Sequence, residues 1–193
     1  MSNSNGATRI SPMASWHADH ANYARLLDSL ERESRSLAAG ERPNYALMLD
    51  ILTYLRHYPD RHHHPREDEV FARVSSRLPG AAAQVSNLAH QHRALAEAGQ
   101  SLLEQIDQAA NDGVVSRAGL INAAGRYIAA YREHIAAEED SIMPRAAAAL
   151  SPEDWNEVAH AGAPSRDPLF GDAPDERYRE LRRTIAHESG GTA

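Results

Sequence analysis

Cysteine is missing from this sequence, and large aromatic residues are few. The 193 residues include no cysteine, two phenylalanines and two tryptophans. Without cysteine, the chain cannot form disulfides, thiolate metal sites, iron–sulfur clusters or cysteine nucleophiles. Any metal ion that this protein binds must therefore be held by nitrogen and oxygen atoms.

Long apolar runs and basic runs are missing as well. No stretch approaches the roughly 20 apolar residues of a membrane-spanning helix, and the polar segment 1–13 lacks the apolar core of a signal peptide. The net charge is −7 with a pI of about 5.9, and no basic stripe is present to neutralise nucleic-acid phosphates. We therefore expect a cytoplasmic protein without nucleic-acid or membrane partners, and its oligomeric state stays open.

Helical periodicity dominates the sequence. Apolar residues recur at steps of three and four over four long segments, whereas alternating apolar and polar runs are scarce. This pattern predicts an all-α fold, an antiparallel up-down four-helix bundle with a short C-terminal helical extension. The helices are expected at residues 12–40, 44–78, 81–111 and 116–150, with a kink in the second near Pro59 and Pro65.

The chain divides into three expected parts. Residues 1–11 are expected to be a disordered N-terminus, and residues 12–150 are expected to form the bundle. Residues 151–193 are expected to add a short helix from Ser151 onward, a loop over 162–174 and a last helix over 175–187. We expect this extension to pack on the bundle.

Histidine is abundant, with eleven residues, and each expected helix carries one at a core position. Because a buried histidine without a polar partner is unfavourable, four that converge indicate a common partner. In two helices a glutamate follows one turn later, and residues four apart lie on one helix face. These pairs are His63 with Glu67 and His134 with Glu138.

The histidine pattern repeats along the chain. His20 and His92 lie 72 positions apart (92 − 20), and His63 and His134 lie 71 positions apart (134 − 63). A helix with one histidine, followed by a helix with His-x3-Glu, therefore occurs twice at nearly the same offset. Such a pseudo-twofold is what a two-metal site between paired helices requires.

Four segments carry a resemblance to a known family: Asp19-His20, HHHPREDEVF at 62–71, Gln91-His92-Arg93 and HIAAEEDSIMP at 134–144. Over residues 12–150 the chain resembles the hemerythrin-like, HHE cation-binding family. The resemblance implies a four-helix bundle around a non-haem pair of iron ions with an oxo or hydroxo bridge. It implies as metal ligands, with both glutamates as bridges, the residues His20, His63, Glu67, His92, His134 and Glu138.

The choice between two neighbouring histidines stays open. His63 pairs with Glu67 at a spacing of four, and His64 pairs equally with Asp68. Comparison with the fourth helix favours His63.

One position departs from the oxygen-carrying hemerythrins. Those proteins have a further histidine one turn after the third-helix ligand, where this sequence has Ala96. Water or a phenol, from Tyr23 or Tyr131, would then take the free position. This difference favours redox chemistry, sensing or the handling of NO and peroxide over reversible oxygen transport.

The ligand types indicate the function. Imidazole and carboxylate suit iron, and six protein ligands with a bridge leave at least one position for a small molecule. We expect a di-iron protein that binds or reacts with O₂, NO or peroxide in oxidative or nitrosative stress, with catalase-like or NO-peroxidase-like turnover as its enzymatic form. The alternative is a module that senses O₂ or iron, or only binds metal, without turnover.

Overall fold

The computed structural model describes residues 12–161 and 166–190, and these are built from helices without any β-strand. The all-α prediction is therefore confirmed. The expectation for residues 1–11 lies outside the described residues. Within the described part of the chain, no helix combines the length and apolarity needed to cross a membrane.

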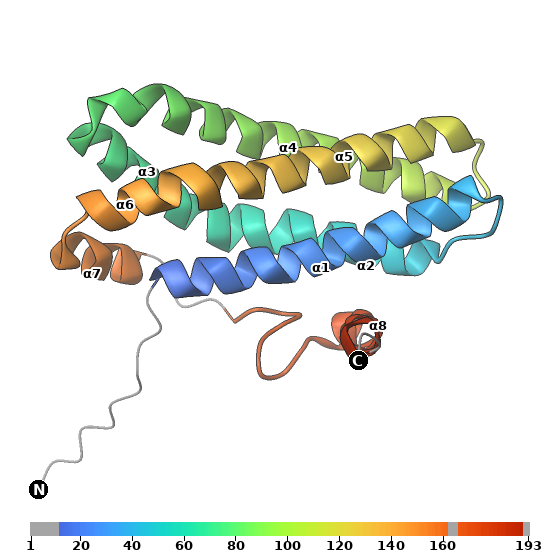
Figure 1. Ribbon diagram of the computed structural model, residues 1–193. Coiled ribbons are helices and arrows are strands. Elements are labelled where there is room, and N and C mark those ends of the chain that lie inside the picture. Colours follow the sequence, from blue (N-terminus) through green and yellow to red (C-terminus); the bar gives the residue numbers. More distant parts are fainter. Residues whose placement is uncertain (1–11, 162–165, 191–193) are drawn as a thin grey trace, which may run out of the picture.

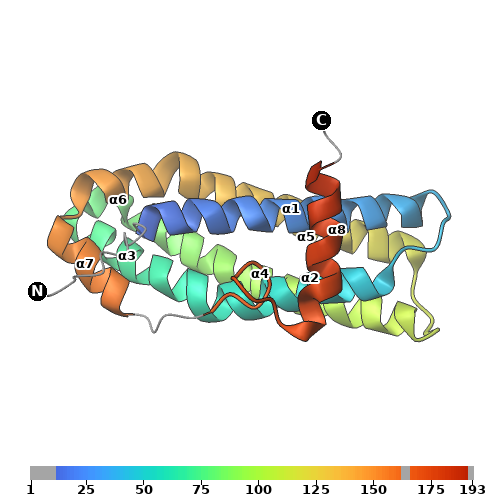
Figure 2. The ribbon, with the colours of Figure 1, turned by 90° about the horizontal axis from the view of Figure 1, so that it is seen from below.

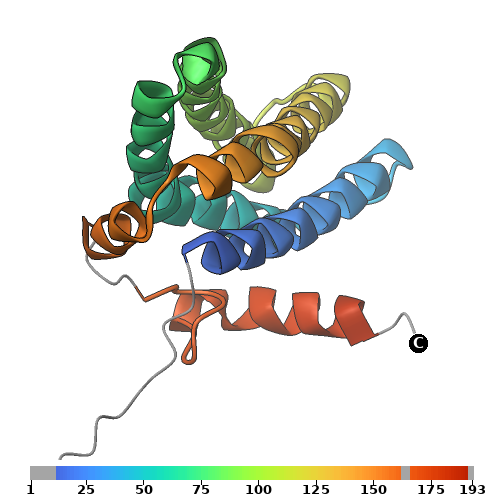
Figure 3. The ribbon, with the colours of Figure 1, turned by 60° about the vertical axis from the view of Figure 1, so that its left-hand side comes forward.

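Four long rods lie side by side in the structure (Figures 1 and 3). Along the chain, α1 packs mainly against α5, α2 against α4, and α4 against α5. Two of the expected helices are divided, so the rods contain more elements than the sequence predicts. The elements are α1 (Pro12–Ala38), α2 (Tyr45–Tyr58), α3 (His64–Arg77), α4 (Ala82–Ala110), α5 (Arg117–Ala137) and α6 (Met143–Ala149).

Two π-turns divide the second and fourth rods: η1 (Pro59–His63) joins α2 to α3, and η3 (Glu138–Ile142) joins α5 to α6. In each, the first residue after the turn donates its backbone N–H to a carbonyl five residues earlier. Pro65 and Pro144 follow closely, and neither has an N–H for the ordinary helical bond. The π-turn η1 lies where the sequence predicts a kink in the second helix, near Pro59 and Pro65. The fourth helix spans nearly its predicted range, but its π-turn η3 was not predicted.

The loop ends of the rods are set by local signals. Gly40 follows α1 with a φ of 87°, a left-handed conformation that favours glycine. The side chain of Asn44 accepts a hydrogen bond from the N–H of Leu47 at the start of α2. At the start of α5, the Ser116 hydroxyl accepts one from the N–H of Gly119. These caps satisfy backbone groups that have no partner within the helix. A short 3-10 helix, η2 (Pro79–Ala81), links α3 to α4.

The apolar core is split into two clusters, and the split occurs where the buried histidines lie. In α1, Trp16 belongs to one cluster and Tyr23 to the other, with His20 between them in sequence. In α4, Leu88 and Leu95 flank His92 in the same way. A polar layer therefore interrupts the core at one level of the bundle.

The C-terminal extension adds α7 (Pro152–Ala161), the 3-10 helix η4 (Glu176–Tyr178) and α8 (Arg179–Gly190). Helix α8 crosses the outer face of α1 and α2 (Figure 2). Four of the extension's side chains are buried in the larger core cluster: Leu169, Tyr178, Leu181 and Ile185. The extension is thus part of the packed structure and not a loose tail.

Because α8 is docked through buried side chains, we expect the protein to lose stability when one of them is shortened. Leu181 is fully buried, so Leu181→Ala is expected to lower the free energy of unfolding by about 2–5 kcal/mol. The control Glu180→Ala changes an exposed side chain of the same helix and should alter stability by less than about 0.5 kcal/mol. Chemical denaturation of the metal-free protein measures both. Equal unfolding curves for wild type and Leu181→Ala would contradict the docking.

Candidate metal centre

Five histidines and two glutamates converge inside the bundle. They come from all four rods: His20 from α1, four residues from η1, α3 and α4, and the remaining two from α5 and η3. Each is at most 8 % exposed, and both glutamates are fully buried. The full set is His20, His63, His64, Glu67, His92, His134 and Glu138.

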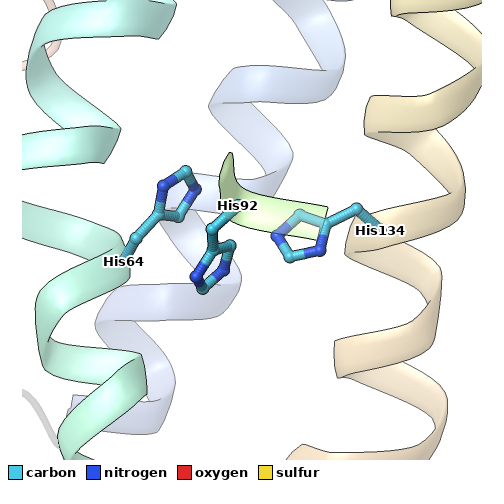
Figure 4. A group of neighbouring side chains, drawn as sticks. All are labelled: His64, His92 and His134. Atoms are coloured by element: carbon cyan, nitrogen blue, oxygen red, sulfur yellow. The ribbon is translucent and has the colours of Figure 1, made fainter. Parts of the chain in front are cut away.

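The seven side chains form two groups joined by the glutamates. His20, His63 and Glu67 offer ligand atoms that lie within 4.8 Å of one another, and so do His64, His92 and His134. Figure 4 shows the three imidazole rings of the second group directed toward one another from α3, α4 and α5. A third overlapping group, Glu67 with His92 and Glu138, connects the two.

Each glutamate presents its two oxygens to different groups. Glu67 Oε1 lies 3.0 Å from His63 Nε2 and 3.4 Å from His20 Nε2, whereas Oε2 lies 3.8 Å from His92 Nε2. Glu138 Oε2 lies 3.3 Å from His20 Nε2, whereas Oε1 lies 3.4 Å from the Nε2 atoms of both His92 and His134. Each carboxylate therefore spans the space between a two-histidine group and a three-histidine group.

Polar side chains outside the centre orient the imidazoles. Glu139 Oε1 lies 2.7 Å from the Nδ1 of His20, and Asp19 Oδ2 lies 3.1 Å from that of His63. The Nδ1 atoms of His64 and His134 face Asp60 and Gln91 at 3.2 and 3.1 Å. Asp68 lies 3.2 Å from the Nδ1 of His92 as an ion-pair neighbour, without hydrogen-bond geometry. An acceptor at Nδ1 fixes the ring and leaves Nε2 for a metal, as outer partners do at metal sites.

The donor atoms at the centre fit metal ions. Both oxygens of Glu67, Oε2 of Glu138 and Nε2 of His134 are buried and have no hydrogen-bond partner among the described residues. Buried carboxylates without such partners are costly unless a cation balances them. Five imidazole nitrogens and two carboxylates are a donor set that suits first-row transition metals. The seven side chains therefore fit a pair of metal ions.

Acidic neighbours raise the pKa of three of the histidines. Burial alone would lower the pKa of His20, but contacts with Glu138 and Glu67 and their charges raise it to about 11. Burial is likewise outweighed at His63, whose pKa rises to about 9 beside Glu67 and Asp19. The pKa of His92 also rises to about 9, through Asp68 and Glu138.

The pKa values of the other buried groups at the centre are lowered. Burial lowers the pKa of His134 to about 4, and it also lowers that of His64. Burial would raise the pKa of Glu67, but the charges and contacts of His63 and His20 hold it well below its ordinary value. Although burial and the charge of Glu67 oppose it, contacts with His20 and His92 also lower the pKa of Glu138.

Metal binding is consequently expected to release protons. His20, His63 and His92 have raised pKa values, so near pH 7 they must each lose a proton before binding. About three protons should leave per filled centre, and metal affinity should rise with pH. Calorimetric titration with metal in buffers of different ionisation enthalpy measures this number. Affinity that is equal at about pH 6 and about pH 8 would contradict the expectation.

The sequence-predicted residues all lie at the centre, and one further residue joins them. His20, Glu67, Glu138 and the others occupy buried positions facing it. The open choice between His63 and His64 has an unexpected outcome, because both are buried and each belongs to a different group. The π-turn η1 ends at His63, and its wide turn directs two consecutive side chains inward.

His64 offers an imidazole that the sequence-based ligand set did not include. Ala96 has no imidazole to offer, but His64 stands beside His92 with their rings stacked at 4.1 Å. Tyr23 and Tyr131, the two phenols that the sequence offers for the free position, lie nearby. Both are buried, and each phenol oxygen is without a hydrogen-bond partner within the described part of the chain. They lie beside the centre, with Tyr23 against the ring of His63 at 5.2 Å.

Comparison with known families agrees with this geometry. The family model "Hemerythrin HHE cation binding domain" matches residues 11–146, which is most of the chain. The chain belongs to the hemerythrin HHE family. The matched range contains all seven converging side chains and ends within α6, before the extension begins. No curated protein matches the chain.

Membership of the hemerythrin HHE family implies metal binding, and the His and Glu groups supply candidate sites for it. The resemblance identified from the sequence is therefore confirmed. The orienting side chains Asp19, Asp60, Asp68 and Gln91 were missed by sequence reasoning. The three acidic residues share a signal, because each lies within four positions of a buried histidine in the sequence. Only Asp60 faces that same histidine, whereas Asp19 and Asp68 face a histidine of another segment.

Proposed function

We propose that this hemerythrin HHE protein holds two iron ions and reacts with a small oxidant, with hydrogen peroxide as the favoured substrate and O₂ or NO as further ligands. The observation that carries the proposal is the opposed direction of the glutamate oxygens. Glu67 and Glu138 each offer one oxygen to the two-histidine group and one to the three-histidine group. This arrangement supports two bridging carboxylates between two metal ions.

The unequal number of histidines supports an open position on one side. His64, His92 and His134 with two carboxylate oxygens provide five protein donors, and a solvent-derived bridge would complete six. His20 and His63 with two oxygens provide four, so the same bridge leaves one place for a small molecule. When bound, an iron pair supplies a Lewis-acidic, redox-active centre at that place.

The protein around the two-histidine group favours a small ligand. Tyr23 contacts the rings of both His20 and His63, at 6.3 and 5.2 Å between ring centres. Its hydroxyl is buried and unpartnered among the described residues, so it can donate a hydrogen bond to an oxygen-containing ligand. A small oxygen-containing ligand at this place would therefore meet both the two-histidine group and the Tyr23 hydroxyl.

The proposal predicts two iron ions per chain and consumption of peroxide. Iron content measured by mass spectrometry, with visible spectra in air, under NO and with peroxide, tests the metal and its ligands. An oxygen electrode and residual peroxide measure turnover, with metal-free protein as the control. Two irons with spectral changes but no consumption would favour the alternative of a sensing or binding module. Fewer than two irons at saturation would overturn the two-iron proposal.

A further inference from the structure

Tyrosines form a connected network of aromatic rings inside the protein. Six of the seven tyrosines belong to it, joined by ring contacts of 5.5–6.4 Å between centres. Only Tyr45 makes no ring contact with the network within the described residues. The members are Tyr23, Tyr54, Tyr58, Tyr127, Tyr131 and Tyr178.

One branch of the network runs from the metal centre to the surface. Tyr23 contacts His63 at its inner end, and its ring centre lies 6.4 Å from that of Tyr54. Tyr54 stacks on Tyr58 at 5.5 Å with ring planes 15° apart. Tyr58 is only half-buried. The branch thus connects a buried histidine of the centre to a ring that solvent can reach.

Tyr54 differs from the buried Tyr23 and Tyr131 because its hydroxyl has a hydrogen-bond acceptor in the protein. It is fully buried and donates a 2.9 Å hydrogen bond to Oδ2 of Asp167. The other oxygen of Asp167 accepts the backbone N–H groups of Leu169 and Phe170, both at 2.8 Å. This carboxylate is held in place by the C-terminal extension. Tyr23 and Tyr131 lack such a partner among the described residues.

This pairing suits a phenol that loses its proton and an electron together. Burial and the charge of Asp167 raise the pKa of Tyr54 far above its ordinary value, so the phenol stays protonated in the resting protein. Oxidation makes a phenol strongly acidic, and Asp167 is positioned to receive the proton. A buried tyrosine without an acceptor would have to retain a positive charge in an apolar environment, which is unfavourable.

We propose that Tyr54 is a redox-active tyrosine that carries single electrons from a small reductant at Tyr58, through Tyr23, to the metal centre, with Asp167 as its proton acceptor. The inference rests on the proposed reaction with peroxide. It also gives the extension a role, because Asp167 lies outside the residues that match the family. The reductant is of the enediol class, with ascorbate as the probe.

The electrons and protons balance over one turnover. Once peroxide has taken electrons from the centre, Tyr54 supplies one electron across the ring of Tyr23, which is not itself oxidised, and the phenolic O–H bond of Tyr54 breaks. The proton forms a new O–H bond on the carboxylate of Asp167. Ascorbate then reduces the Tyr54 radical at the Tyr58 end, and Asp167 returns the proton. In two such transfers the two ascorbate monoanions each lose one electron and one proton and become ascorbate radical anions. Those two electrons and two protons convert one hydrogen peroxide into two waters.

The test is to mix the iron-loaded full chain with hydrogen peroxide, freeze it, and record electron paramagnetic resonance spectra. A neutral tyrosyl radical is expected in wild type and in the control Tyr45→Phe. Tyr54→Phe is expected to lose that signal while keeping its iron. Asp167→Asn retains an oxygen for the two backbone N–H groups but cannot take the proton, and it is expected to lose the signal as well. Peptide mapping should find oxidised Tyr54 in wild type.

The outcomes separate this inference from the proposed function. Peroxide consumption with the same radical signal in Tyr54→Phe as in wild type overturns the inference alone. The inference is also overturned if peroxide is consumed without any tyrosyl radical and Tyr54→Phe oxidises ascorbate as fast as wild type. Iron-loaded wild type that does not consume peroxide overturns the proposed function and this inference with it. Equal iron content and helical circular dichroism show that the variants are folded.

Discussion

Replacing Glu67 with glutamine is expected to abolish binding of the metal pair. The two oxygens of Glu67 face opposite histidine groups, so the change removes a negative charge and a donor from both sites at once. An amide nitrogen cannot bridge two cations. At metal concentrations about 1,000-fold above the wild-type Kd, the wild-type protein gains about 4 kcal/mol of stability by binding. The variant should lose this gain.

Iron analysis and thermal unfolding with and without metal measure both effects. Glu69→Gln is the matched control, because it changes an exposed glutamate on the same helix that pairs with Arg73. This variant should bind two ions and gain stability like wild type. Two tightly bound irons in Glu67→Gln, with an unchanged visible spectrum, would exclude a bridging role for Glu67.

Replacing His64 with alanine is expected to leave one metal site intact and to empty the other. His64 belongs to the three-histidine group with His92 and His134, and that group loses a donor. The two-histidine group retains His20 and His63. We therefore expect iron content to fall from two to about one per chain, since transition metals need several donors for tight binding. The near-ultraviolet bands of a bridged pair should vanish.

His62→Ala provides the control for this prediction. His62 precedes His63 in the same run, but it is partly exposed and lies against the ring of Tyr58 at 5.4 Å. Its replacement should leave both metals in place. If His64→Ala retains two irons while His63→Ala does not, His64 is not a metal ligand and the sequence-based choice of His63 alone is the better one.

Much of the metal centre could be predicted from the sequence because the signals were periodic. His20, His92 and His134 share helical faces with apolar neighbours, and a straight α-helix presents such residues to one side. The repeat of the histidine pattern after 71 and 72 positions then indicated that the first two helices correspond to the last two. The burial of these residues in the structure agrees with that expectation, and the family match covers them all.

The inward position of His64 could not be predicted in this way. In an α-helix consecutive residues point about 100° apart, so the sequence forced a choice between His63 and His64. The π-turn η1 allows both to face the centre. Its signal was present in Pro65, which removes a helical hydrogen bond, but a proline indicates an interruption without showing its shape. The position of Asp167 beside Tyr54 depends on tertiary packing and has no local signal.

The π-turns have a consequence for how this centre could have arisen and could be lost. A π-turn contains about one residue more than an α-helical turn, so it amounts to a single inserted codon within a continuous helix. Removing one residue from 59–63 would restore an ordinary helix and rotate everything upstream relative to α3 by about 100°. Either Tyr54 or the ligands of α3 would then leave the interior. The metal centre and the apolar core are therefore kept in register by one residue.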